Sequence, residues 1–318
     1  MSAIKKSFLL LPLLILSITA FGQQMPFNPI SYRIFTPFLL NPAIAGSKDF
    51  LSADFGAGFR GKSNSQILSA NGRVARKVSE YVASGKTYSF TNIGIGGSVF
   101  NDLNTDSLTH SAGAGITGAY HFPLDNRGLS YLALGASFKG LYNYYEGNTE
   151  REIPPKEFYF PEIDLGIYLY NPDFYAGISA TNLINPPVDT STVSIYRVPV
   201  SRQYNFIGGY KLVISRALKL VLEPSLIIST DDSLSFNIRK NVQPIIRLYA
   251  GNFCIGTYFN NSNKVSFFFQ YRYPKFYVGA FVALPKNSPF YKSPITTELA
   301  AGINLTRSKS GSSNTGHW

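Results

Sequence analysis

Histidine and cysteine, the side chains most often used for metal binding and nucleophilic catalysis, are scarce in this sequence. The three histidines, His110, His121 and His317, do not stand at a spacing that suits a metal site. His121 and Asp125, with one of many serines, would supply the residue types of a hydrolase triad, but their spacing fixes no geometry. The sole cysteine, Cys254, has no partner in the chain for a disulfide and is expected to be a small apolar strand residue. The sequence therefore predicts no catalytic or metal site.

Two glycine-rich stretches match the spacing of a dinucleotide-binding loop. They are Gly56–Gly61 (GAGFRG) and Gly113–Gly118 (GAGITG). Such a loop needs a helix directly after the glycines and an acidic residue about 20 positions further on. No helical period follows either stretch, so we interpret both as glycines within strands and expect no cofactor.

Six charged side chains fall on the polar face of predicted strands. If the strands close into a barrel, these charges would face its hydrated interior, the lumen. There they could tune the passage of solutes or hold a plug, but pairing with one another is the simpler expectation. These residues, predicted to face the lumen, are Lys139, Asp164, Lys211, Glu223, Arg272 and Glu298.

The stretch 161–181 (PEIDLGIYLYNPDFYAGISAT) shows the type of element that would position these residues. Apolar residues alternate with small or polar residues on both sides of Asn171-Pro172, which is the two-residue period of strands. Folded as an antiparallel hairpin about Asn171-Pro172, the stretch pairs Leu169 with Phe174 and sorts one apolar face from one polar face. Because proline suits the second central position of a tight turn poorly, we expect a slightly wider loop with this same pairing.

The same alternation recurs to the end of the chain. A second predicted hairpin, about Pro274-Lys275, pairs Tyr271 with Val278. By these signals we predict about fourteen strands, near 51–60, 65–74, 91–100, 109–121, 129–141, 160–170, 173–182, 203–213, 217–228, 241–250, 253–260, 264–273, 276–284 and 295–305.

The connections between the predicted strands help to decide between a soluble β-sandwich and a membrane barrel. We number each connection by the predicted strand that it follows, counting from a periplasmic N-terminus. Most even-numbered connections are short, as at Gly251-Asn252, whereas several odd-numbered ones are long, as at 142–159 and 183–202. Short periplasmic turns and long external loops are typical of outer-membrane barrels. We therefore predict an all-β fold, an antiparallel transmembrane β-barrel over 51–305, and keep the sandwich as the minor alternative.

The N-terminus has the pattern of an export signal. Two lysines, the apolar run FLLLPLLILSIT and small residues at Ala20 and Gly22 indicate a signal peptide over residues 1–22. No later apolar run is long enough for a membrane-spanning helix. An irregular, proline-containing segment follows over 23–50, and a polar tail covers 306–318.

The chain is basic, with a formal net charge of +11 over 318 residues, of which 45% are hydrophobic and 15% aromatic. Nucleic-acid binding would need a clustered basic stripe with stacking aromatics. Here the basic residues are scattered, and export also argues against a nucleic-acid partner.

Several motifs resemble those of one known family. Residues 40–46 (LNPAIAG) are similar to the L-N-P-A-x-x-G signature of the PorP/SprF family, outer-membrane proteins of the type IX secretion system of Bacteroidota. Further stretches resemble the family in the same order, and they are Asn92–Asp102, Leu129–Gly140, Pro161–Leu183 and Gly208–Ser229. Two features depart from the pattern: Gly61-Lys62 follows Arg60 where the family often has Gln-Trp, and the polar tail has no family counterpart.

The resemblance implies a non-enzymatic outer-membrane barrel that assists export or surface attachment of cargo with C-terminal secretion domains, such as gliding adhesins. It also implies partners among the secretion-system proteins, namely periplasmic ring components and the translocon barrel, as well as outer-membrane lipid. The matching signature residues, expected to be a structural or docking element at the periplasmic mouth, are Leu40, Asn41, Pro42, Ala43 and Gly46.

Two other functions stay open from the sequence. A channel or transporter barrel for small solutes shares every barrel feature and differs only in having an open lumen. An outer-membrane enzyme would need a convergent acid, base and nucleophile, and none is evident.

Overall fold

The structure is a computed structural model of the chain. It describes residues 34–48, 51–61, 63–77, 88–104, 109–125, 130–147, 154–184, 202–231, 237–260, 264–273, 276–285 and 295–305. The expected signal peptide and polar tail lie outside these ranges, and so does most of the expected irregular segment before Ile34.

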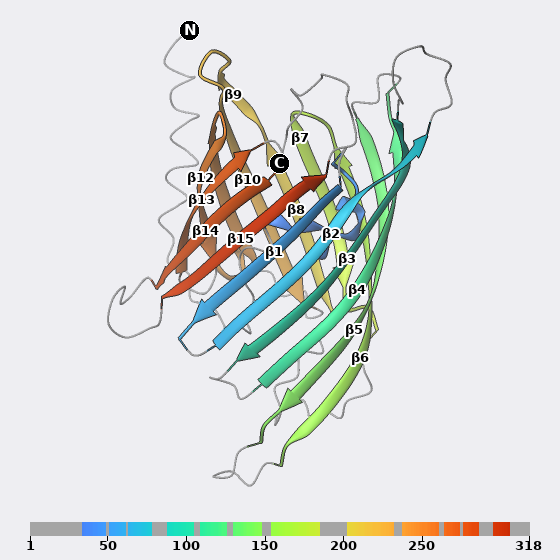
Figure 1. The fold of residues 1–318 in the computed structure, drawn as a ribbon, viewed down its shortest axis with the longest axis vertical. Helices are drawn as coiled ribbons and strands as arrows, with labels where there is room; N and C mark the ends of the chain where they lie inside the picture. The colour runs from blue at the N-terminus through green and yellow to red at the C-terminus, as the bar shows by residue number, and fades with distance from the viewer. Residues whose placement is uncertain are drawn as a thin grey trace.

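The described chain forms one antiparallel sheet that closes on itself (Figure 1). Closure comes from β10–β11 pairing at one side and β15–β1 pairing at the other. β8 and β9 both pair with β10 and occupy one position of the ring, which therefore has fourteen positions. The strands are β1 Leu51–Arg60, β2 Ser63–Lys77, β3 Tyr88–Asn104, β4 Thr109–Pro123, β5 Tyr131–Tyr145, β6 Lys156–Tyr170, β7 Phe174–Thr181, β8 Gln203–Tyr210, β9 Leu212–Ser215, β10 Leu220–Asp231, β11 Val242–Ala250, β12 Phe253–Asn260, β13 Lys264–Tyr273, β14 Phe276–Pro285 and β15 Thr296–Leu305.

Side chains alternate between the inside and the outside of this ring. Along β15 every second residue is buried, so Glu298 is 2% exposed while the next residue, Leu299, is 58% exposed. Exposed apolar side chains lie on the outside of nearly every strand, including Ile116 on β4 and Phe138 on β5. An apolar outside and a polar inside are what a barrel in lipid requires, and a sandwich would require the reverse.

The two ends of the barrel differ in the length of their connections. At one end, here called the turn end, β6–β7, β11–β12 and β13–β14 are joined across 171–173, 251–252 and 274–275. At the other, the loop end, longer connections such as 146–155 and 182–202 join β5–β6 and β7–β8. β1 begins and β15 ends at the turn end. The predicted parity holds for these connections, with 78–87 a long exception at the turn end and 61–62 and 261–263 short exceptions at the loop end.

The register predicted for the first hairpin is wrong by two residues. Leu169 pairs with Ala176 and not with Phe174, which places the turn at Pro172-Asp173. Pro172 then takes the first central position, where proline is favoured, and Asn171 Oδ1 accepts hydrogen bonds from the amides of Asp173 and Phe174. Since the shift is even, each side chain keeps its predicted face. The second hairpin has the predicted pairing of Tyr271 with Val278.

One predicted strand, 203–213, is interrupted. It divides at Lys211 into β8 and β9, where the Lys211 amide donates to the carbonyl of Asp173 at 2.7 Å. The described helical elements are short: η2 Pro37–Leu39, η3 Pro42–Ile44 and α4 Ile238–Asn241. No helix in the described ranges is both long and apolar enough to cross a membrane.

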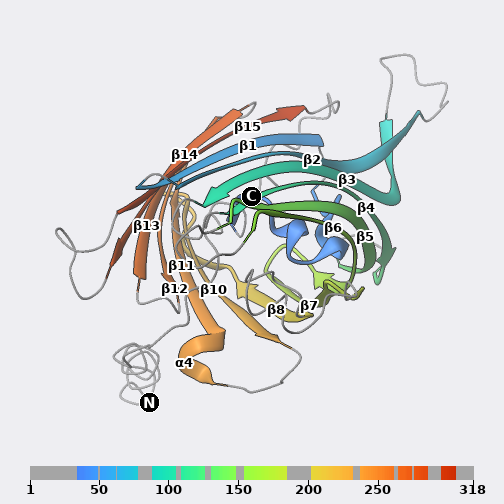
Figure 2. The same cartoon turned by 90° about the horizontal axis from the view of Figure 1, so that it is seen from below.

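Residues Ile34–Lys48, here called the plug, lie inside the ring of strands (Figure 2). η3 contacts β4, β5 and β6, and the plug side chains Phe38, Ala43 and Ala45 are buried. From the sequence the signature was expected at the periplasmic mouth, and whether the segment enters the barrel was left open; the structure places residues 34–48 within the lumen.

Candidate functional site: the luminal plug

Asn41 fixes the plug to the barrel wall. Its side chain is 1% exposed and caps η3 by accepting a hydrogen bond from the amide of Ala43 at 3.0 Å. Its Nδ2 donates to the carbonyls of Ile167 and Ile178, at 3.0 and 3.2 Å, which are directly paired residues of β6 and β7. Ser179 adds a hydrogen bond from its hydroxyl to the carbonyl of Leu40. One short amide therefore joins a turn of the plug to two strands.

Glycines on the inner wall make room for the plug backbone. A Cβ added at Gly135 on β5 would lie 2.3 Å from the backbone nitrogen of Ala43, and one at Gly166 on β6 would lie 2.0 Å from Asn41 Oδ1. A Cβ at Gly94 on β3 would lie 2.0 Å from the plug and one at Gly177 on β7 would lie 2.7 Å from it. Contacts this short exclude any side chain, so the wall and the plug fit each other only because these positions are glycine.

The C-terminal part of the plug is held by a second set of hydrogen bonds, here called the latch. His121 Nε2 lies 2.9 Å from the carbonyl oxygen of Ala45, and Arg73 Nε donates to the carbonyl of Gly46 at 3.0 Å. Since His121 Nε2 faces a carbonyl, it carries the proton, and Nδ1 accepts from the hydroxyl of Tyr170 at 2.9 Å. Arg73 also donates to that hydroxyl. The latch thus ties the plug to β2, β4 and β6.

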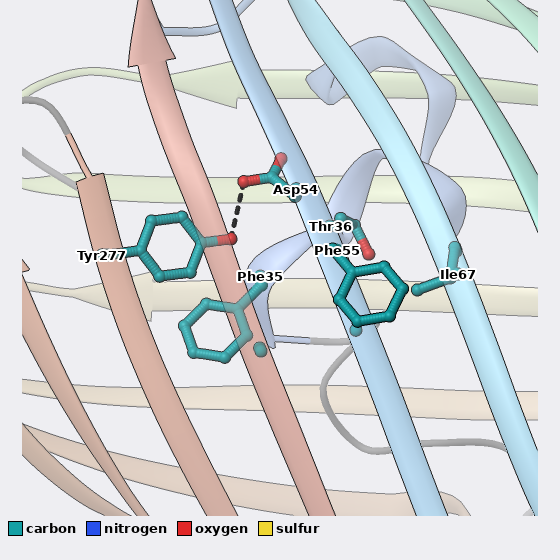
Figure 3. A pocket seen from close by; sticks show the side chains of 8 residues that line it. Phe35, Thr36, Asp54, Phe55, Ile67 and Tyr277 are labelled. Carbon is teal, nitrogen blue, oxygen red and sulfur yellow. Dashed lines mark hydrogen bonds between the residues drawn. The ribbon is translucent and has the colours of Figure 1, made fainter.

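The N-terminal part of the plug packs against the opposite side of the ring. The ring of Phe35 lies 5.0 Å from that of Tyr277 and 5.2 Å from that of Phe281, both on β14. Figure 3 shows Phe35 beside Tyr277, whose hydroxyl donates to Asp54 Oδ1 at 2.6 Å. The plug therefore crosses the lumen from β14 to β6.

Two of the predicted lumen charges form an ion pair. Lys139 Nζ on β5 lies 2.5 Å from Asp164 Oδ2 on β6. Asp164 also accepts hydrogen bonds from the Ser137 hydroxyl at 2.8 Å and the Asn182 amide at 3.1 Å. These contacts satisfy a carboxylate that is 1% exposed.

Glu223 lies in a second ion pair that was not expected from the sequence. It is fully buried on β10 and pairs with Arg247 on β11, while the Tyr175 hydroxyl on β7 donates to Glu223 Oε1 at 2.8 Å. Arg247 and Tyr175 were not among the predicted site residues. Their inward position follows from strand alternation, but their meeting with Glu223 depends on the register of β10 against β11 and on the approach of β7 to β10.

The other predicted lumen residues lie apart from these pairs. Glu298 is buried on the inner face of β15, and Lys211 lies at the turn-end rim, where β8 and β9 meet. The backbone of Arg272 pairs with Tyr277, but its side chain lies outside the described part.

The residues that could have supplied chemistry have structural partners. His121 belongs to the latch, and Asp125 accepts from the amide of Ser130 at 3.1 Å, so the two do not form a triad. The glycine stretches lie on β1 and β4, with no helix after them. Among the described residues, no three His, Cys, Asp or Glu side chains are grouped to hold a metal ion.

A cavity of about 60 Å³ separates the plug from part of the wall. On the plug it touches Ile34, Ile44 and Lys48, and on the wall it is lined by tyrosines together with Arg247 and Gln270. The cavity therefore lies between the plug and side chains of β6, β7, β8, β11, β13 and β14.

The apolar exterior, the closed ring and the filled interior define an outer-membrane β-barrel with a luminal plug. The family model described as type IX secretion system membrane protein PorP/SprF matches residues 29–303, which include both plug and barrel. The chain belongs to this family, and it is an outer-membrane component of the type IX secretion system.

Several solved barrels are similar at low identity. They include outer membrane protein Omp33 of Acinetobacter baumannii (TM-score 0.48, 11% identity, 82% of this chain and 100% of that chain) and the NanC porin (0.39, 10%, 80% and 100%). A third is BamA from Haemophilus ducreyi lacking POTRA domains 1–3 (0.39, 10%, 81% and 71%). No curated protein matches the chain.

Proposed function

We propose that this protein assists the export or surface attachment of cargo proteins with C-terminal secretion domains, gliding adhesins among them. The observation that carries the proposal is the family match, which spans the plug and the barrel together. The family is a secretion-system component and not an enzyme family, so we infer that the protein works by binding and positioning other proteins.

The filled lumen supports this role over that of a channel for small solutes. The plug fills the half of the lumen next to β3–β7. In the other half, large side chains point inward from β10 to β14 and are almost fully buried, among them Ile227, Ile245, Tyr258 and Phe281. A solute channel needs a hydrated path through such an interior. The described residues instead favour an accessory barrel that is closed at rest.

The partners follow from the same role. Periplasmic ring components would reach the turn end, where the described plug residues Ile34 and Lys48 lie, and the translocon barrel would share the membrane. Cargo would contact the loop end, whose long connections suit recognition.

The test is a comparative secretome. The gene is deleted in its host, the strain is complemented with the intact gene, and proteins of the surface and the medium are identified by mass spectrometry. Loss of one or a few proteins with C-terminal secretion domains would support a cargo-specific role, and loss of all of them a role in the core machinery. An unchanged secretome in a strain without related genes would contradict the proposal and favour the channel.

A further inference from the structure

We propose that the plug is withdrawn through the turn end of the barrel, and that this movement opens the lumen while cargo is handled. The inference rests on the proposed export role and adds a mechanism of control to it. It is argued from the course of the plug, its contacts and the shape of its seat.

The plug enters and leaves the lumen at the same end. Ile34 and Lys48 line one cavity together with Tyr175 and Tyr249. Tyr175 is the second residue of β7 and Tyr249 the penultimate residue of β11, and both positions are at the turn end. After Lys48 the chain continues to Leu51, where β1 begins, also at the turn end. The plug is therefore a loop inserted from one side, and it can leave without threading through the barrel.

The hydrogen bonds described above join the plug to the wall on one side of the lumen. Asn41 and the latch supply hydrogen bonds to β2, β4, β6 and β7. On the other side, the plug has the ring contacts of Phe35 with β14, and a cavity of about 60 Å³ lies beside them. A pull on the chain preceding Ile34 would break Phe35–β14 contacts first and then the Asn41 contacts, one group after another.

Bare backbone forms part of the seat, beside the side chains of the latch. Gly94, Gly135, Gly166 and Gly177 present bare main chain to the plug. No wall side chain at these four positions has to move when the plug leaves, and the wall that remains is smooth. A segment that served only as permanent filling could be packed equally well by large inward side chains, as in the half of the lumen next to β10–β14.

A reversible covalent lock tests the inference. A Cβ at Gly166 would lie 2.9 Å from Asn41 Cγ, so cysteines at these two positions come within reach of a disulfide. The variant Asn41→Cys with Gly166→Cys is made in a Cys254→Ala background, which removes the sole native cysteine. The complete protein is expressed in the deletion strain, and disulfide formation is followed by gel shift.

With the lock oxidised, we expect cargo in the medium to fall at least tenfold, and reduction of the same cells to restore it. In planar bilayers the oxidised protein should stay closed, while the reduced protein, which also lacks the Asn41 amide, should open often. Matched controls are each cysteine alone. A second lock, Asn41→Cys with Gly177→Cys, joins the plug to β7 and serves if the first does not assemble, because a Cβ at Gly177 would lie 2.7 Å from Asn41 Nδ2.

Normal secretion by a fully cross-linked barrel would overturn the withdrawal and would leave the export role intact. Normal secretion by the deletion strain would instead overturn the export role itself. The two failures are therefore distinguished by which strain secretes.

Discussion

Asn41 joins three backbone segments with one short side chain. Its carboxamide oxygen caps η3, and its nitrogen bonds to β6 and β7. Pro42 follows it at the first position of η3, where a missing amide proton costs nothing. Asn-Pro in the signature is therefore explained by two independent requirements, a cap and a helix start, and the asparagine carboxamide both accepts and donates here.

Replacing Asn41 with alanine should weaken the fold measurably. The change leaves the Ala43 amide and two wall carbonyls without this partner, so we expect the free energy of unfolding to fall by about 2–3 kcal/mol. The loss of stability is measured from the heat-modifiable migration of the purified barrel on a gel. The matched control is Asn143→Ala, which removes a hydrogen bond from the Ser111 hydroxyl near the loop end of β5 and should cost about 1 kcal/mol. Equal stability of the two variants would contradict a special role for Asn41.

Strand alternation alone predicts which charged residues point inward, but not which of them meet. Asp164 and Lys139 lie on strands next to each other in sequence, and their pairing was the expected type of contact. Glu223 is paired with Arg247, and this contact depends on the register across 232–241, which no sequence pattern specifies. The latch is less predictable still, because Arg73 and His121 bond to backbone carbonyls of a distant segment.

At the scale of elements, β5 carries glycines on both its inner and its outer face. Gly135 faces the plug and Gly140 faces outward, where an added Cβ would meet nothing within 4 Å. The sequence predicts strand glycines, but only the position of the plug explains why Gly135 carries no side chain.

The variants Gly135→Ala and Gly140→Ala form a matched pair on this strand. The first places a methyl group 2.3 Å from the Ala43 nitrogen, so the plug must shift away from the wall. We expect hydrogen exchange of the amides over 34–48 to accelerate at least tenfold in Gly135→Ala and to stay as in the native protein in Gly140→Ala. The measurement is hydrogen–deuterium exchange with mass spectrometry. Unchanged exchange in Gly135→Ala would mean that the wall yields instead of the plug.

The strands themselves were largely predictable, because period-two alternation is a local signal. The bounds of β1, β12 and β13 agree with the prediction, and the shift in the β6–β7 register comes from assigning the turn one residue too early. The plug was not predictable as an element. Its residues form two turns of 3-10 helix whose location depends on contacts with strands on both sides of the ring, and no periodicity within 23–50 reports those contacts.

At the scale of the whole molecule, the apolar exterior predicts where charge is tolerated. Ile116 on β4 and Leu218 in the β9–β10 turn are 71% and 73% exposed, but only Ile116 lies within the span of the strands. Arginine at the centre of a lipid-facing strand costs about 2–4 kcal/mol. We expect Ile116→Arg to lose about that much stability when the urea-unfolded chain folds into lipid vesicles, and Leu218→Arg to behave as the native protein. Equal tolerance would contradict the lipid-facing assignment.

The direction of the barrel in the membrane decides which compartment can act on the plug. If the turn end faces the periplasm, proteins there can reach the chain before Ile34, and the long connections face the exterior. An epitope inserted between Ala217 and Leu218 should then bind antibody only in permeabilised cells, whereas one inserted after Gly147, at the loop end, should bind on intact cells. Both insertions lie in connections between strands, so each serves as the control for the other's assembly. The opposite labelling would place the plug's described ends outside the cell, where no periplasmic partner could withdraw it.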